Sequence, residues 1–387
     1  MPTRRRFLAI LGGGTLLAAT PAAAWLGTRT PHAALEPWAL AGAHEEPRRR
    51  ALSFALLAPN PHNRQPWLVD LSKPDTVVLY AQEGRDLPHT DPYGRQITIG
   101  LGCFLELMRM AAAEDGWRVE TERFPEGWSP DGLDARPVAR ATFHRDAGVQ
   151  RDPLFAHVPA RRTCKEVYDI ERVPDAALAA SLVADLAHTR GGATVDPAEV
   201  AAWRDLAVEA STIEMSTDRT HRESVDLLRI GRAEIEANPD GIDLGGPFLS
   251  TLAALGQLDR ENLADPTSAQ FKQSAPAILD PIRSAPAWVW LVSADNDRPT
   301  QLGVGADWLR SQLRATAAGL SFNPHSQSLQ EYPEMAALHR TVHERLAPGG
   351  GTVQMLARIG YGPDVPPSPR WRLETRVLGA AEGAAAA

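Results

Sequence analysis

Two glycine-marked apolar segments, 203 positions apart, limit what this chain of 387 residues can fold into. The glycines that coincide after the shift are Gly100 with Gly303, Gly102 with Gly305, and Gly116 with Gly319. Both segments carry apolar residues at helical spacing. We therefore predict a repeated unit, whose two copies pack about an internal pseudo-twofold axis as the subunits of a homodimer do.

Strand candidates flank each glycine-marked helix in the same order. TVVLYA (76–81) precedes the first helix and ARATFHR (139–145) follows it, whereas WVWLVSA (288–294) and TVQMLARIG (352–360) flank the second. LVDL (68–71) is a further strand candidate, and a helix is expected from 48 until Pro59 stops it. This order predicts an α+β fold with a first half at 25–150 and a second half at 151–378.

An insertion at about 196–285 has no counterpart in the first half. Its apolar spacing predicts several helices, broken by the Asn238-Pro239-Asp240-Gly241 turn. An insertion of this size on one half is where a lid would be found.

The first 24 residues have the parts of an export signal. Arg4, Arg5 and Arg6 precede the apolar stretch FLAILGGGTLLAAT and an Ala-Ala-Ala end. Thr3 to Leu8 matches the twin-arginine pattern, which predicts the Tat export machinery as a partner and a periplasmic or extracellular location. The alternative is a signal-anchored membrane form, but three consecutive glycines and the marginal length disfavour a membrane-spanning helix. No later stretch is expected to be apolar enough to span a bilayer.

Charge and cysteine content exclude several classes of protein. The net charge is −8, and removing residues 1–24 removes three arginines, which leaves 37 − 48 = −11. This balance disfavours nucleic acid as the main partner. Cys103 and Cys164 are too few for a disulfide scaffold or a four-cysteine zinc site. His339 and His343 could share a metal, but a solvated helix face is preferred and no metal is predicted. The tail at 379–387, GAAEGAAAA, is predicted to be disordered.

Three polar stretches remain as candidates for chemistry, since the chain lacks G-x-S-x-G, H-E-x-x-H, C-x-x-C, Walker A and Rossmann motifs. They are APNPHNRQPW (58–67), RRTCKEVYD (161–169) and IGYGPDVPPSPRWRLE (359–374). Arg161, Thr163 and Lys165 alternate along an extended segment, which would form an anion cradle. Arg370 and Arg372 alternate in the same way.

Together the three stretches resemble motifs of the FMN-binding nitroreductase family, in its duplicated single-chain (Acg-type) branch. The resemblance implies a nitroreductase-like α+β fold that is internally duplicated as a pseudo-dimer. In homodimeric members each FMN lies between subunits, with the loop motif from one and the cationic motifs from the other. Here the loop occurs only in the first half and the cationic stretches only in the second. The resemblance therefore implies one FMN per chain, held between the halves of a monomer.

The resemblance also implies residue roles. Arg161, Arg370 and Arg372 would pair with the FMN phosphate, and Thr163 would bond the phosphate or the ribityl chain. Lys165, one of three lysines in the chain, would face flavin N1 and the C2 carbonyl, where a cation stabilises the charge of the reduced ring. The first half would contribute Pro59, Asn60, His62, Asn63 and Gln65.

The resemblance extends to a loop in the second half, and this sequence departs from the family pattern at two positions of the first half. Ser326 and Gln327 match the loop whose backbone N–H groups approach flavin N5. Asn60 and Pro61 depart from the serines common in the family, which puts hydroxyl contacts at these positions in doubt. Cys164 lies inside the phosphate motif, where a small structural residue is preferred to a redox thiol. No side chain is assigned a catalytic role, because the chemistry takes place at N5.

Two functions remain open. The first is an FMN-dependent oxidoreductase that transfers two electrons through N5 to a nitroaromatic, a quinone or a similar small acceptor. The second is an FMN-binding or flavin-sequestering protein with a lid and little turnover. Because the exported compartment has no soluble NAD(P)H pool, an exported enzyme would need a membrane or protein electron donor. A relative that has lost its flavin is least favoured, since five positions on the cationic side match the family.

Overall fold

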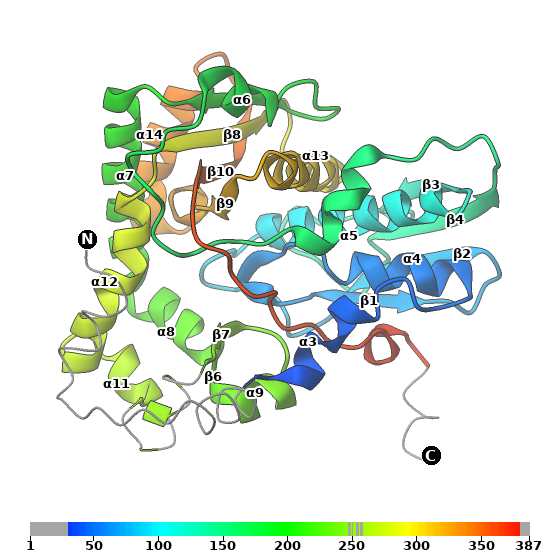
Figure 1. Cartoon of the computed structure of the whole chain (residues 1–387), viewed down its shortest axis with the longest axis horizontal. Helices are drawn as coiled ribbons and strands as arrows, with labels where there is room; N and C mark the ends of the chain where they lie inside the picture. Colours follow the sequence, from blue (N-terminus) through cyan, green and yellow to red (C-terminus); the bar gives the residue numbers. More distant parts are fainter. Residues whose placement is uncertain (1–29, 247–248, 250, 253–254, 256–257, 380–387) are drawn as a thin grey trace.

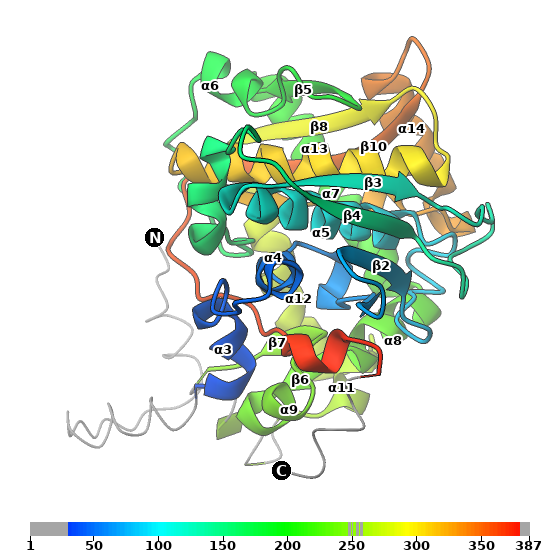
Figure 2. The same ribbon diagram turned by 90° about the vertical axis from the view of Figure 1, so that its right-hand side faces the viewer.

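The computed structural model describes residues 30–246, 249, 251–252, 255 and 258–379. The export signal predicted at 1–24, and the predicted disordered tail apart from Gly379, lie outside these residues. The described chain forms two four-stranded antiparallel sheets, with two long helices side by side between them (Figure 1, Figure 2).

The first half contains one sheet with the strand order β1-β2-β4-β3. Its elements are α3 (His32–Ala39), α4 (Pro47–Ala55), the 3-10 turn η1 (Pro61–Asn63), β1 (Trp67–Asp70), β2 (Thr76–Ala81), α5 (Arg95–Glu114), β3 (Trp117–Arg123), β4 (Ala139–Arg145) and η2 (Pro153–Ala160). Alternate residues of β1 and β4 are buried, as expected for strands with one face on the core.

The second half contains a sheet with the order β5-β8-β10-β9. Its elements are α6 (Ala176–Ser181), β5 (Arg190–Thr194), β8 (Ala287–Ser293), α13 (Arg298–Ala317), β9 (Ser321–Pro324), η3 (Gln327–Leu329), η4 (Pro333–Met335), α14 (Ala336–Leu346), β10 (Thr352–Gly360) and η5 (Leu373–Arg376). In both halves the first two strands precede the long helix and the last two follow it, and the sheet order is the same.

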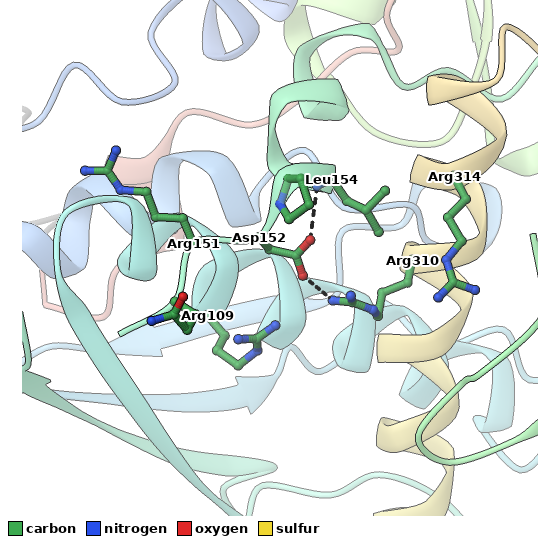
Figure 3. A pocket seen from close by; sticks show the side chains of 8 residues that line it. Arg109, Arg151, Asp152, Leu154, Arg310 and Arg314 are labelled. Atoms are coloured by element: carbon green, nitrogen blue, oxygen red, sulfur yellow. Dashed lines mark hydrogen bonds and ion pairs between the residues drawn. The ribbon is translucent and has the colours of Figure 1, made fainter. Parts of the chain in front are cut away.

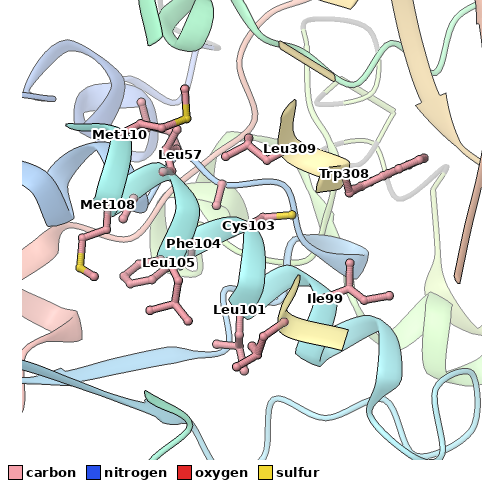
Figure 4. Packing of buried hydrophobic residues seen from close by; sticks show 14 of the residues in the cluster. Leu57, Ile99, Leu101, Cys103, Phe104, Leu105, Met108, Met110, Trp308 and Leu309 are labelled. Carbon is pink, nitrogen blue, oxygen red and sulfur yellow. The ribbon is translucent and has the colours of Figure 1, made fainter. Parts of the chain in front are cut away.

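The long helices α5 and α13 correspond residue by residue under the shift of 203. Both have 20 residues, and both are followed by a left-handed glycine, Gly116 or Gly319. A Cβ atom on Gly102 would collide with the carbonyl of Leu302, and one on Gly305 would collide with the carbonyl of Ile99. These contacts are each other's counterparts, so the helix pair has the reciprocal geometry of a twofold interface. Apolar side chains, among them Phe104 and Trp308, pack around the crossing (Figure 4).

Two buried arginines repeat this reciprocity at the start of the helices. Arg95, the first residue of α5, donates to the carbonyls of Leu329 (2.7 Å) and Gln354 (2.8 Å) in the second half. Its counterpart Arg298 donates to the carbonyls of Ser129 (3.1 Å) and Pro130 (3.2 Å) in the first half. Each half therefore satisfies backbone groups of the other, which couples their folding.

The insertion is helical, as predicted, and also contains a small parallel sheet. Its elements are α7 (Pro197–Ser216), α8 (Asp218–Asp226), β6 (Leu228–Ile230), α9 (Gly231–Ala237), β7 (Ile242–Leu244), α11 (Arg260–Ala264) and α12 (Ala269–Arg283). β6 pairs in parallel with β7, and both α9 and the predicted 238–241 turn lie between them in the sequence. In Figure 1 these elements lie together beside the two sheets.

Two expectations about surfaces need correction. By length and composition α5 could cross a membrane, contrary to the expectation for residues after the signal, because it has 20 residues and few of them are charged. Its most apolar window is 89% buried, however, as in the core helix of a folded protein. His339 and His343 are half-buried rather than on a solvated face, because their rings stack and His343 Nε2 accepts from Val353 N (3.0 Å). The described residues contain no group of three or more metal-ligating side chains.

Candidate functional site

Loop 58–65, between α4 and β1, has an unusual backbone. His62, Asn63 and Gln65 all have left-handed conformations, with φ of 47°, 51° and 48°. Asn60 closes the loop: its Oδ1 accepts from Gln65 N (2.7 Å) and its Nδ2 donates to Ala58 O (3.1 Å). Each such conformation costs on the order of 1 kcal/mol or more, and strain of this kind gathers at functional sites. The loop is therefore held in one shape by its surroundings.

Two arginines of the second half meet this loop at the C-terminal end of α4. Arg370 donates through Nε to Leu56 O (2.7 Å) and through Nη1 to Asn63 Oδ1 (2.6 Å). Arg161 donates to Leu57 O (3.0 Å) and to Gln312 Oε1 on α13 (3.0 Å). The structure thus brings the predicted loop of one half against predicted cationic residues of the other. Cations are also favoured at a helix C-terminus, where carbonyl groups lack partners.

The charges of these two arginines are buried without a carboxylate partner among the described residues. Arg161 is 3% exposed and Arg370 is 2% exposed, and the oxygens that accept their hydrogen bonds are neutral. Desolvation lowers the pKa of Arg161 to about 10 and that of Arg370 to about 9. The charge of Arg161 also lowers the pKa of Arg370, and the charge of Asp243, which forms no ion pair with it, acts in the opposite direction. Burying a cation without a counter-charge is unfavourable. An anion such as a phosphate would supply the missing charge.

The segment that carries Lys165 lies along β9. Cys164 N donates to Phe322 O (3.1 Å), and the buried Arg358 donates through Nη2 to Cys164 O (3.1 Å) and Glu166 O (2.9 Å). Both carbonyls flank Lys165, so Arg358 fixes the backbone on either side of it. Thr163 is half-buried and the Lys165 side chain is exposed. Desolvation, then the charges of Lys165 and Arg64, lower the pKa of His62 to about 4. Lys165 is therefore near the loop, and His62 is neutral at pH 7.

Ser326 and Gln327 follow β9 directly, in a stretch with several buried polar atoms that lack partners. Within the part of the chain that the structure describes, these atoms are Gln327 Oε1, Ser328 Oγ and both ring nitrogens of His325, and loop 58–65 adds His62 Nδ1. Buried polar groups in folded proteins are nearly always hydrogen-bonded. Their orphaned state is what a site for a polar ligand would show, and it fits a flavin with its many donors and acceptors.

The remaining predicted residues have different places. Gln65 is buried, and its Oε1 accepts from Trp371 N (2.9 Å), which ties the loop to the 370–372 segment. Pro59 is half-buried. Arg372 is not brought to Arg161 and Arg370: it is 56% exposed and pairs with Glu36 of α3. Its contact with a phosphate at the other two arginines stays a prediction.

Sequence patterns did not reveal that the insertion docks on this loop. Gln65 Nε2 donates to Pro239 O (2.7 Å), and Gly241 N donates to Asn63 O (3.2 Å). Asp240, between them, is buried and forms ion pairs with Arg85 of the first half and Arg229 of the insertion. The sequence predicts the turn at 238–241, but the partners of this turn in the first half are more than 150 positions away.

The two cysteines are buried and free. Burial raises the pKa of Cys103 to about 12, so its thiol is unreactive, and its Sγ lies 3.1 Å from Gly305 O at the helix crossing. Cys164 is 3% exposed, with Sγ 3.6 Å from Pro363 O, as fits a small packed residue.

Comparison with known proteins finds relatives that span most of the chain. No family model matches the chain. It is 28% identical over 336 residues to the Mycobacterium tuberculosis protein named "Putative NAD(P)H nitroreductase Rv3131", covering 84% of this chain and 89% of that protein. A 95-residue stretch is 37% identical to "Putative NAD(P)H nitroreductase acg" of the same organism, covering 24% of this chain and 28% of that protein. Over most of its length the chain is therefore similar to proteins named as nitroreductases.

Solved structures of nitroreductases were also found. The FMN-dependent nitroreductase NfnB from Mycobacterium smegmatis, in complex with NADPH, aligns with a TM-score of 0.36 and 16% identity, covering 57% of this chain and 94% of NfnB. A "putative nitroreductase" from Anabaena variabilis aligns with a TM-score of 0.42 and 11% identity, covering 85% of this chain and 91% of that protein. Because both TM-scores are below 0.5, the similarity to nitroreductases rests on the sequence relatives.

Proposed function

We propose that this nitroreductase-like chain is an FMN-dependent oxidoreductase that binds one FMN between its two halves. The carrying observation is the pair of buried arginines, Arg161 and Arg370, which lack a carboxylate partner among the described residues and meet the strained loop of the opposite half. A phosphate dianion matches their charge and their planar donors. The repeated strand order supports an internal duplication that has kept one of two flavin sites.

The chain's own residues would bind and orient the cofactor. Bound FMN supplies two-electron transfer at N5 to a nitroaromatic, a quinone or a similar small acceptor. Arg161 and Arg370 hold the phosphate, and Lys165, fixed by Arg358, places a positive charge where reduction deposits negative charge. Neutral His62 adds no charge of its own. The 238–241 turn is hydrogen-bonded to loop 58–65 and lies against it.

The electron donor depends on where the protein acts. The Mycobacterium tuberculosis relatives are named for NAD(P)H, which supports a nicotinamide donor inside the cell. Twin-arginine export, which we include in the proposal, would replace it with a membrane or protein donor. Changing Arg4, Arg5 and Arg6 to lysine should then keep the protein in the cytoplasm. Unchanged export of this variant would refute the twin-arginine assignment.

Flavin sequestration is the second candidate, favoured by the docking of the insertion. The hydrogen bonds from Gln65 and Gly241 hold the 238–241 turn against the loop, and Asp240 anchors that turn through two arginines. A cover fixed in this way would slow both flavin release and the entry of an acceptor.

A spectrum and a reduction assay separate these functions. The chain from Trp25 onward would be purified, and its flavin absorbance recorded before and after addition of FMN. If the chain is an oxidoreductase, NADH, NADPH or a dithionite-linked donor should reduce its bound FMN. A quinone should then reoxidise the FMN, over many turnovers. Bound FMN without turnover would favour sequestration, and failure to take up FMN would overturn both.

A further inference from the structure

A second arginine-rich site lies beside the same helix pair. A cavity of about 510 Å³ is formed by the C-terminal halves of α5 and α13 and by residues 150–154 (Figure 3). Four arginines line it: Arg109, Arg151, Arg310 and Arg314. The only carboxylate in its lining is that of Asp152. We call it the arginine cavity.

Two carboxylates neutralise half of the positive charge of the arginine cavity. Glu106 accepts from Arg109 (2.7 Å) and Arg310 (3.0 Å), and Asp152 pairs with Arg310. Both carboxylates are largely buried, with side chains 9% and 13% exposed, and so they hold these two guanidinium groups in place. Four cations against two anions leave two positive charges, which is the complement of a phosphate monoester dianion.

The remaining two arginines are the ones open to a ligand. Arg314 donates to backbone carbonyls at the end of α6, those of Ser181 (3.3 Å) and Leu182 (3.4 Å) among them. Arg151 is exposed, and no ion pair or hydrogen bond of its guanidinium is recorded among the described residues. In Figure 3, Arg310 and Arg314 project from one helix, while Arg109 and Arg151 come from the other side of the cavity.

The position of the cavity repeats that of the flavin site. The shift of 203 places Arg109 on Gln312, the residue that accepts from Arg161. Arg314 binds carbonyls at the C-terminal end of α6, the helix before the first strand of its sheet; it does so from within the same half, whereas Arg161 and Arg370 reach the end of α4 from the opposite half. A pseudo-twofold axis relating the halves therefore relates the two sites.

We propose that the arginine cavity is a second anion site, which binds a phosphate monoester through Arg151 and Arg314 and does not bind flavin. Flavin is excluded because the segment before β5 has no equivalent of loop 58–65. At that place His188 packs against Gly303, as Asn60 packs against Gly100, and β5 begins two residues later. Asp307 fixes this short segment by accepting from Ala187 N (3.1 Å) and His188 N (2.8 Å).

Calorimetric titration of the FMN-saturated protein with inorganic phosphate tests the proposal, at low ionic strength and with chloride replacing phosphate in the blank. Saturation with FMN keeps free phosphate away from Arg161 and Arg370. Arg151→Gln is the main variant, because an exposed side chain without recorded partners can be changed without unfolding the chain. Arg314→Lys keeps a cation but loses the planar donors. Arg222→Gln, in an exposed ion pair with Glu261 of the insertion, is the matched control.

The expected result is phosphate binding that weakens about tenfold in Arg151→Gln and in Arg314→Lys and is unchanged in Arg222→Gln. Arg370→Gln identifies the site, since it removes a cation at loop 58–65 and should leave this binding intact. Wild-type protein without measurable phosphate binding would overturn the proposal. So would unchanged binding in Arg151→Gln, or loss of binding in Arg370→Gln. The titration is then repeated with ribose 5-phosphate. If the natural ligand is a phosphorylated small molecule, ribose 5-phosphate should bind at least as tightly as free phosphate.

Discussion

The proposed flavin site and the arginine cavity occupy related positions on the two halves, but the positive charges of their arginines are balanced differently. At the flavin site two arginines are buried and bind neutral oxygens, whereas in the arginine cavity two of four arginines share carboxylates and the cavity is open. The first arrangement is unfavourable without an anion, and the second is stable with or without one. A duplicated scaffold can therefore keep a site that requires its ligand on one side and a site with optional occupancy on the other.

The largest loss of stability is expected from a substitution at the crossing of α5 and α13, because both sites depend on this contact. Gly305→Val adds a side chain that would collide with the Ile99 carbonyl, and the two helices would have to separate. Overpacking of a core costs about 1–3 kcal/mol or more, so the midpoint of chemical unfolding should fall markedly. Gly132→Ala is the control, because nothing lies within 4 Å of its added Cβ. Equal midpoints for the two variants would contradict the close helix contact.

The next largest effect is on FMN affinity, and it should differ between Arg370 and Arg372. Arg370→Ala should weaken FMN binding by roughly 10- to 100-fold, since it removes a buried cation whose charge-assisted bonds hold the loop. Arg372→Ala should change it by less than about threefold, because Arg372 is exposed and paired with Glu36. Fluorescence titration with FMN measures both. If Arg372→Ala strips the flavin as strongly, the phosphate is bound differently from the way the apo geometry indicates.

Lys165→Met tests the electrostatic role assigned to Lys165. Loss of the cation should lower the two-electron potential of bound FMN by on the order of 30 mV, while FMN affinity changes little. Lys73→Met, on the exposed face of the first half, is the matched control. A potential that is the same in both variants would show that Lys165 does not lie beside N1.

At neutral pH the smallest effect is expected from the loop histidine, whose contribution appears only as the pH is lowered. The pKa of His62 is lowered from 6.5 to about 4 in the folded chain, so between these values the unfolded chain binds the proton and the folded chain does not. Wild-type stability should therefore fall as pH decreases from 6.5 to 4, by up to about 3 kcal/mol from this group. His62→Gln should lose less stability over the same range in urea unfolding. Parallel pH profiles would show that His62 is solvated.

Much of the fold could be predicted because the repeated elements have strong local patterns. The strands at 76–81, 139–145 and 352–360 have the predicted bounds, since they alternate or are continuously apolar. β3 was missed because it is mostly exposed and highly charged, so that no apolar period marks it. β5 was missed because glycines are poor strand formers; here Gly191 and Gly192 are required, since added Cβ atoms would collide with Val183 and Trp290.

The candidate site was predictable in its motifs and not in its charge balance. Loop 58–65, Arg161 and Arg370 meet as the motif order indicated, because each motif is local and the fold brings the halves together. The burial of these arginines without carboxylates, the outward position of Arg372 and the docking of Asp240 all depend on tertiary packing. No residue pattern along the chain encodes them.

The FMN stoichiometry of the purified chain from Trp25 onward tests the central claim most directly. Equilibrium dialysis against FMN, with protein measured by amino-acid analysis, should give one flavin per chain in the wild type. Arg370→Ala should give much less than one, and Arg151→Gln should still give one. Two flavins per chain, none, or equal loading of wild type and Arg370→Ala would contradict a single flavin site between the halves.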